Sequence, residues 1–269
     1  MLRLGRSALP VIAVLALVRS ATAQDYSVDL GYEVRYGPLR VVSMELTSEV
    51  AGDRYRATTA FKTEGLYGLL FPWHAESESQ GRREGALLQP CWHRADGVYR
   101  SERRTVAIDY QPDGAVDAHV TPPPEDKVRD AVPEALQRAT VDPLTAGLLA
   151  VGAECQGRLP VFDGRRRYDL RLEELAPAMV PESSGALYEG SARRCRATVE
   201  ARAGYWRDDP RKSGKPTTLD FWIASPGEHL PGVPVYLELS GARGTLAVVL
   251  KSVRALDSER SGPATPPTS

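Results

Sequence analysis

Hydrophobic and polar residues alternate along most of the chain beyond residue 24, with a period of two positions. In RVVSMELTSEV, residues 40–50, the side chains of Val42, Met44 and Leu46 face one way, and the polar side chains between them face the other. A short turn, AGD, leads into residues 54–63, which alternate in the same way, so the two runs predict a β-hairpin with one buried face. Further strands, separated by turns that contain glycine or proline, are predicted at residues 104–110, 218–224, 233–239 and 244–253.

Signals of a helix are concentrated in VDPLTAGLLAVG, residues 141–152. Asp142 is a good N-cap, Pro143 suits the first helical position, and Gly152 can end the helix. A helix so short and so apolar is expected to be buried against the sheet, and its leucines are Leu144, Leu148 and Leu149. The sequence therefore predicts a mainly β fold with a single antiparallel, curled or barrel-like sheet and one short buried helix.

The first 23 residues differ from the rest. Arg3 and Arg6 precede an apolar run, and Ala21-Thr22-Ala23 follows it, which is the order of features in a cleavable signal peptide. The alternatives are a membrane anchor or a buried N-terminal helix, but the run is too short to span a bilayer. We therefore expect cleavage after Ala23 and no transmembrane segment in the mature chain.

Residues 24–254 contain no linker and are expected to form a single β-rich domain, whereas residues 255–269, rich in serine, threonine and proline, read as a disordered tail. Lysine is scarce and asparagine is missing, which suggests a bacterium with a G+C-rich genome, so export predicts a periplasmic location. Cleavage removes three arginines and no acid and changes the net charge from −1 to −4. A chain without a strongly basic surface is a poor candidate for binding nucleic acid.

The three cysteines cannot all pair within one chain. Cys155 and Cys195 flank a predicted strand pair, and disulfides persist in exported proteins, so these two are the expected disulfide. Closing that loop would stabilise the fold by about 4 kcal/mol in the chain-entropy model. Cys91 would be left over, and we interpret it as a small buried hydrophobic residue in preference to a reactive nucleophile.

One arginine departs from the expected pattern. In LPVFDGRRRYDLRL, residues 159–172, the Asp-Gly pair predicts a tight hairpin turn. Beyond it Arg166 falls in phase with Tyr168 and two leucines, while Arg165, Arg167, Asp169 and Arg171 form the other, solvated face. A buried guanidinium needs a carboxylate or a bound anion. Arg166 and Tyr168 are thus candidate ligand-binding residues; the alternative is that Arg166 reaches water at the strand end or pairs with an acid.

Here the sequence resembles a known family. VFDGRRRYDL between Cys155 and Cys195, VDPLTAGLLAV, and FKTEGLYGLLFPW at residues 61–73 resemble a family of bacterial exported proteins, the domain of unknown function numbered 3108. The resemblance covers most of residues 26–253. It implies an envelope protein of mostly β structure and supplies no catalytic residues.

Signatures of common enzymes are missing from the sequence: there is no G-x-S-x-G, H-E-x-x-H, P-loop, G-x-G-x-x-G or C-x-x-C. His74, Glu76 and Glu78 would share one face of a strand and could bind a metal or act as acid and base, but a solvated charged face is the simpler interpretation. We predict no catalytic residue, no metal site and no cofactor.

The glycine-interrupted run TEGLYGLLFPW adds two candidate ligand-binding residues, Tyr67 and Trp73, which could line an apolar cavity or edge a groove. The alternative is a corner between strands that fills the core.

Two classes of function remain. The first is a non-catalytic envelope protein that binds a lipid-like or anionic ligand, or scaffolds an envelope protein; the second is a hydrolase of envelope polysaccharide or peptidoglycan that uses the acids near His74. A deep apolar cavity favours the first, and a polar cleft with converging carboxylates favours the second.

Overall fold

The computed structural model describes residues 25–99, 101–123, 129–152, 154–206, 208, 217–227, 230–241 and 244–256. The predicted signal peptide and all but the first two residues of the predicted tail lie outside these described residues. The first half of the chain forms long strands, one helical turn and two helices: β1 (Tyr26–Tyr36), β2 (Leu39–Ala51), β3 (Arg54–Thr63), α1 (Gly65–Leu70), β4 (Trp73–Glu84), β5 (Leu87–Tyr99), β6 (Glu102–Tyr110), β7 (Val116–Thr121), α2 (Glu134–Gln137) and α3 (Pro143–Gly152). The second half is almost entirely β: β8 (Gly157–Phe162), β9 (Arg167–Glu174), β10 (Ala178–Met179), the 3₁₀ turn Glu182–Ser184, β11 (Ser191–Ala203), β12 (Thr217–Ala224), β13 (Val233–Gly241) and β14 (Gly244–Ala255).

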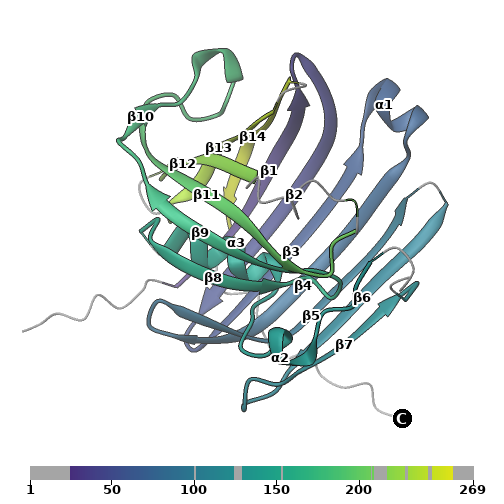
Figure 1. Ribbon diagram of the computed structural model, residues 1–269. Helices are drawn as coiled ribbons and strands as arrows, with labels where there is room; N and C mark the ends of the chain where they lie inside the picture. Colours follow the sequence, from purple (N-terminus) through teal and green to yellow (C-terminus); the bar gives the residue numbers. More distant parts are fainter. Residues whose placement is uncertain are drawn as a thin grey trace, which may run out of the picture.

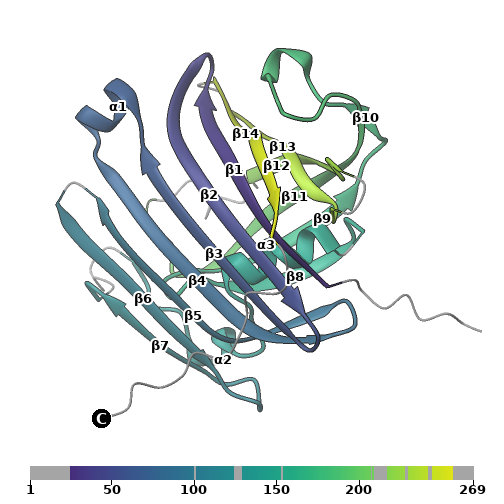
Figure 2. The ribbon, with the colours of Figure 1, turned by 180° about the vertical axis from the view of Figure 1, so that it is seen from behind.

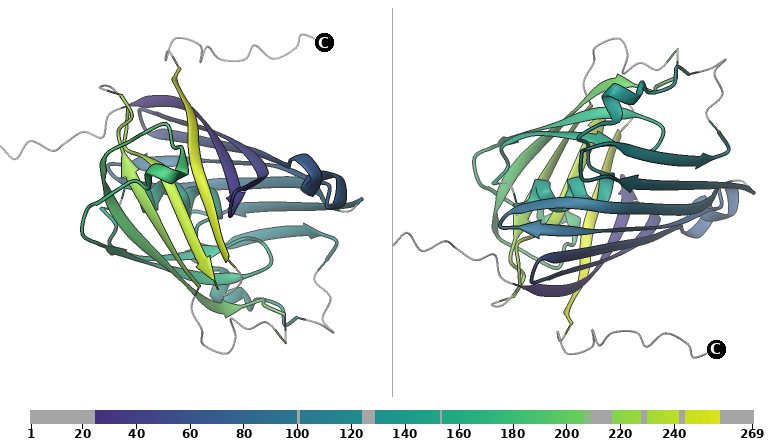
Figure 3. Two further views of the ribbon diagram at one scale, coloured as in Figure 1. Left: turned by 90° about the horizontal axis from the view of Figure 1, so that it is seen from above. Right: turned by 90° about the horizontal axis from the view of Figure 1, so that it is seen from below.

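All the strands except β10 run in one antiparallel sheet, in the order β7-β6-β5-β4-β3-β2-β1-β14-β13-β12-β11-β9-β8, and β10 pairs with β11 beside this path. Each predicted strand is present, and the predicted hairpin of residues 40–63 is β2 paired with β3. The sheet curls around α3, which Figure 1 and Figure 2 show from opposite sides and Figure 3 shows from both ends. Among the described residues no ladder joins β7 to β8, so the sheet is barrel-like but not closed.

The gap between β7 and β8 is bridged by the segment that leads into α3. On one side the amide of Ala139 donates to the carbonyl of Gly114, in the turn before β7. On the other side Val141 pairs with Val161 of β8. This segment therefore makes backbone hydrogen bonds near both edges of the sheet, and α3, which follows it, lies in the interior.

Helix α3 starts as predicted, because the Asp142 carboxylate accepts hydrogen bonds from the backbone amides of Leu144 and Thr145 at 2.9 and 3.0 Å. The helix lies inside the curled sheet, but its leucines are not the residues that it buries. The buried side chains of α3 are small, Thr145, Ala146 and Ala150, and the leucines are only half-buried. Small residues on the contact face let the helix backbone approach the sheet closely, which leaves the larger side chains to its flanks.

The predicted disulfide is present between Cys155 and Cys195, whose Cα atoms are 5.6 Å apart. Both cysteines are fully buried in a cluster with Ala150 of α3 and Phe221 of β12, so the disulfide lies where the helix ends against the sheet. The interpretation of Cys91 as buried is wrong: it is a free, exposed cysteine, placed beside the irregularity where Gly81 pairs with Pro90.

Candidate functional site

A fully buried polar cluster surrounds the start of α3. The Asp142 carboxylate accepts hydrogen bonds from the hydroxyls of Ser79 and Thr145, both at 2.6 Å, besides capping the helix. The Thr145 hydroxyl lies 2.7 Å from that of Tyr55, and Ser79 lies 2.9 Å from Nδ1 of His93. The cluster thus ties α3 to β3, β4 and β5 by side-chain hydrogen bonds.

Ser79, His93 and Asp142 are the residue types of a hydrolase triad, but their arrangement differs from one. The Ser79 hydroxyl has one proton, which it donates to Asp142, so it accepts a hydrogen bond from Nδ1 of His93. A catalytic serine would instead donate to the imidazole, and the aspartate would hold the opposite ring nitrogen. Burial lowers the pKa of His93 despite Asp142 nearby, which keeps the ring neutral. The cluster is structural.

A cavity of about 250 Å³, partly open to solvent, lies beside the C-terminal end of α3. One wall is the inner face of β1 and β2, including Val28, Leu30 and Leu46. The opposite wall is α3 at Leu148, and the segment 231–234 before β13 forms another side. Its lining is mostly apolar, as expected of a site for an apolar ligand or part of one.

One charged side chain, that of Arg193, lines this cavity. Its guanidinium donates to the carbonyl of Val151 at the C-terminal end of α3, at 3.0 Å, and no described carboxylate lies within ion-pair distance of it. A cation at a helix C-terminus is favourably placed, and its other N–H groups can serve a ligand. The sequence analysis missed Arg193. The signal was its phase, because Arg193 lies on the same face of β11 as the buried Cys195 and Ala197.

Arg166 and Tyr168, two of the four residues singled out from the sequence, lie at the β8–β9 turn. The turn forms at Asp163-Gly164 as predicted, with Gly164 at φ 84°. The Arg166 side chain is 42% exposed and pairs with Asp163 at 2.8 Å, so the structure gives it an acid partner within its own turn. Tyr168 points toward the interior, where burial raises its pKa in the neighbourhood of Asp163 and Asp142. A ligand role for either residue stays a prediction.

The expectation that the other face of β9 is solvated is wrong for Asp169. This carboxylate is buried and pairs with Arg167 at 2.6 Å and Arg202 at 2.7 Å, with Arg158 further away at 3.4 Å. Burial opposes ionisation, but hydrogen bonds from Arg167 and Arg202 outweigh it and lower the pKa of Asp169. Part of the arginine-rich face therefore serves a structural ion-pair network across β8, β9 and β11.

Tyr67, in α1, and Trp73, the first residue of β4, are the other two candidates, and Figure 1 shows α1 at the tip of the connection between β3 and β4. Both are partly exposed. Trp73 packs edge-on against Phe61 and Tyr67 against Phe71, with ring centroids 4.3 and 5.1 Å apart. The structure does not bring this pair together with Arg166 and Tyr168. The core-filling alternative is wrong for the leucines of α1, because the helix buries none of its residues.

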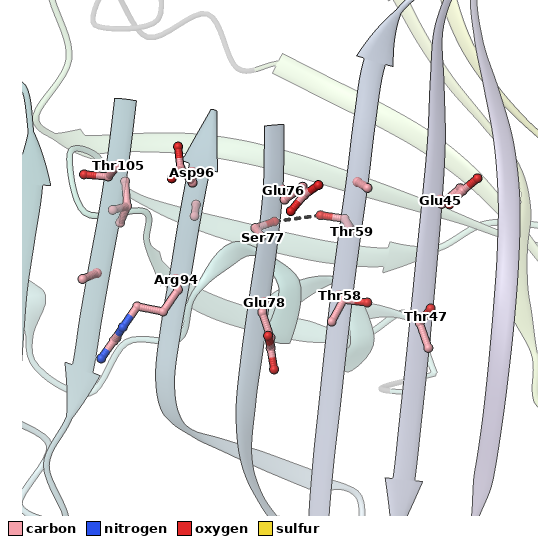
Figure 4. Close-up of a pocket in the computed structure, with 14 residues that line it drawn as sticks. Glu45, Thr47, Thr58, Thr59, Glu76, Ser77, Glu78, Arg94, Asp96 and Thr105 are labelled. Carbon is pink, nitrogen blue, oxygen red and sulfur yellow. Dashed lines mark hydrogen bonds between the residues drawn. The ribbon is translucent and has the colours of Figure 1, made fainter. Parts of the chain in front are cut away.

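A shallow groove of about 560 Å³, lined by polar and small apolar residues, crosses the outer face of β2 to β6. Its walls include four acids, which Figure 4 shows: Glu45, Glu76, Glu78 and Asp96. Glu76 and Glu78 alternate with Ser79, which contacts α3, so the groove lies on the face away from the helix. His74, Glu76 and Glu78 share this face as predicted, but the described residues contain no group of three metal-ligating side chains.

Glu78 does not converge with the other carboxylates of this groove, whereas Glu76 and Asp96 are direct cross-strand partners on β4 and β5. In Figure 4 Glu78 points away from Glu76 and Asp96. Burial alone would raise the pKa of Glu78, but hydrogen bonds from Arg56 and Gln80 outweigh it and lower the pKa. A hydrogen bond from Arg103 lowers the pKa of Asp96. A glycosidase needs one carboxyl whose pKa is raised so that it can donate a proton. These two acids are held in the opposite state.

Comparisons with known proteins support the fold. A family model described as "Protein of unknown function (DUF3108)" matches residues 31–251. The chain is similar to a solved structure from Brucella abortus, a β-barrel-like protein of the domain of unknown function DUF1849, with 11% identity, a TM-score of 0.51, and coverage of 87% of this chain and 99% of that one. None of the curated proteins matches. Among the described residues, no helix is long and apolar enough to cross a membrane.

Proposed function

The chain belongs to the DUF3108 family, whose description gives no activity, and we propose from its own geometry that it is a non-catalytic envelope protein that binds an amphiphile. The observation that carries the proposal is the cavity between α3 and the inner face of β1 and β2. Apolar ligands favour such a lining because transfer from water stabilises them by roughly 25 cal/mol per Å². The predicted signal peptide and the disulfide support an exported protein.

The size of the cavity limits the ligand. Sites for whole small molecules span about 300–1,000 Å³, and this one holds about 250 Å³. It therefore accommodates a slender apolar chain or one part of a larger amphiphile. Arg193 favours a ligand with an anionic end. Its guanidinium has further N–H donors that suit a carboxylate or phosphate at the end of the apolar chain.

The alternative, a hydrolase of envelope polysaccharide or peptidoglycan, has weaker support. Its acids line the outer groove, where Glu78 points away from the others and the pKa values of Glu78 and Asp96 are lowered. The one Ser-His-Asp grouping described is buried and oriented for structure. No observation in the described residues favours catalysis over binding.

Ligand binding can be measured with cis-parinaric acid, a fluorescent fatty acid, together with native mass spectrometry of protein purified from the periplasm. Leu148→Trp fills part of the cavity and should reduce probe affinity about tenfold or more. Leu149→Trp is the matched control, because Leu149 is equally half-buried on α3 and does not line the cavity. Equal probe affinity in the two variants, with both folded, would overturn the proposed site.

Arg193→Met tests the polar end of the site. It should weaken binding of the carboxylate probe by about tenfold and leave the methyl ester of the same probe unaffected. Arg171→Met, an exposed arginine on β9, should change neither affinity. Identical carboxylate binding by the Arg193 and Arg171 variants would remove Arg193 from the site and leave only an apolar cavity.

A further inference from the structure

Among the described residues, the most exposed large apolar side chains gather at one end of the sheet, at the connection between β3 and β4. Leu66, Leu69 and Leu70 of α1 are 80%, 79% and 72% exposed. Their spacing places them on one face of the helical turn. Leu39, at the start of β2, is also exposed, and α1 packs beside that strand. Figure 1 and Figure 2 show α1 projecting at the tip of this hairpin. Contiguous exposed apolar surface of this kind marks an interaction site.

The α1 tip, residues 65–73, has the composition and the backbone pairing that suit an apolar environment. Residues 65–73 contain no charged side chain. The amide of Gly68 donates to the carbonyl of Glu64 and that of Phe71 to Tyr67, so backbone groups pair within the tip. At its base the Thr63 hydroxyl donates to the carbonyl of Phe71 and accepts from the amide of Trp73, both at 3.0 Å. Polar backbone groups must be paired internally wherever lipid replaces water.

Charges around the base of the tip are arranged with the basic ends outward. Glu33 pairs with Arg35 and Arg40 at 2.8 and 3.2 Å, and Glu64 pairs with Arg40 and Lys62 at 3.4 and 3.7 Å. Three bases thus share two acids. The two carboxylates are largely covered, whereas the side chains of Lys62 and Arg40 are the exposed members. In this collar of five side chains beneath the leucines the bases outnumber the acids by one, and its exposed members, Lys62 and Arg40, complement an anionic lipid surface; Glu45 and Glu76 lie next to Lys62, further along the sheet.

We propose that the α1 tip docks on an anionic lipid surface, with Leu66, Leu69 and Leu70 inserted among the lipids and Lys62 and Arg40 at the headgroups. Tyr67 and Trp73 lie at the depth where aromatic rings with a polar edge are favoured, between the leucines and the charged collar. The contact is peripheral, because six helical residues reach only the headgroup and outer acyl region. It goes beyond the proposed ligand binding and is independent of it, since the tip and the cavity share no residue.

Vesicle flotation of the full mature chain tests this. We expect the protein to float with vesicles of phosphatidylethanolamine and phosphatidylglycerol and less with phosphatidylcholine alone. High salt should lower flotation with the anionic vesicles and leave that with phosphatidylcholine unchanged. The triple variant Leu66→Ser, Leu69→Ser, Leu70→Ser should lose at least about a hundredfold in partitioning. Because α1 buries none of its residues, this variant should unfold at the same urea concentration as the wild type.

The matched control is Leu87→Ser, because Leu87 is similarly exposed but lies at the other end of β4 and β5. It should float like the wild type, and Lys62→Gln should reduce binding to the anionic vesicles alone. Wild-type protein that binds neither vesicle, or a triple variant that binds as the wild type does, would refute the proposal. A dimeric wild type and a monomeric triple variant would also refute it, because the tip would then be a contact between two copies of the chain. Leu148→Trp should still float, which separates failure of this inference from failure of the ligand site.

Discussion

Substitution of Asp142 should show how strongly one buried carboxylate holds α3 inside the sheet. Asp142→Ala removes the N-cap, which costs about 1 kcal/mol. It also leaves the hydroxyls of Ser79 and Thr145 without their acceptor in a fully buried site, at about 1–3 kcal/mol each. The expected loss is about 3–7 kcal/mol, a large share of the roughly 5–15 kcal/mol that stabilises a typical domain.

Asp142→Asn should be milder, because one oxygen remains for the backbone amides and for Ser79. The new amide group faces Thr145, which then has to donate its proton to Tyr55, and the Tyr55 hydroxyl loses the acceptor that it had. One buried donor is therefore unpaired in place of two, together with a lost charge, and the expected cost is about 1–3 kcal/mol.

Urea unfolding followed by tryptophan fluorescence and circular dichroism measures both losses, provided the slope of the transition is unchanged. The control is Asp113→Asn, an exposed aspartate that also accepts a backbone amide, which should change stability by less than about 0.5 kcal/mol. If Asp142→Ala stays within about 1 kcal/mol of the wild type, the helix is held by packing and the disulfide, and the reasoning about the polar cluster fails.

Two further predictions concern titration and the β8–β9 turn. Burial lowers the pKa of His93, with Asp142 and Asp163 opposing and Arg94 assisting, so the unfolded chain binds the proton first. Stability should fall as pH drops from about 7 below the ordinary histidine value near 6.5, and His93→Gln should flatten that part of the curve; parallel curves would contradict this. Arg166→Met should cost only about 1 kcal/mol, because backbone amides still satisfy Asp163, and an anion that co-purifies with the wild type but not with this variant would support the predicted ligand role.

Local patterning was sufficient to predict the strands and the start of α3. The alternation in residues 40–63 and the Asp-Pro pair at the helix start depend on neighbours within a few positions, so they can be read from the sequence. The polar cluster could not be read in this way. Tyr55 and Thr145 are 90 positions apart, and nothing local indicates that β3 and α3 meet. The same holds for Asp169, which is buried by arginines from β9 and β11 that approach only after the sheet has formed.

The α1 run shows a different limit. A glycine-interrupted apolar segment has the same composition whether it fills a corner or projects from the surface, and here it projects. The alternation of inward and outward positions is informative inside a strand. It was applied to Arg166, which lies in the turn before β9 begins, where the alternation does not hold. Arg193, well inside β11 and in phase with the buried Cys195, satisfies the same argument more fully.

The polar cluster and the cavity follow from one feature of α3. The helix packs mainly against β3, β4, β5 and β8. Its small residues, Thr145, Ala146 and Ala150, allow that close approach, and the hydrogen bonds of Asp142 hold it there. A helix held against one wall of a curled sheet leaves space at the other wall, and the cavity lies on that side, between Leu148 and the inner face of β1 and β2. Interiors without a ligand are normally packed to the density of organic crystals. The cavity beside Arg193 is an exception to this density, which supports the proposed bound molecule.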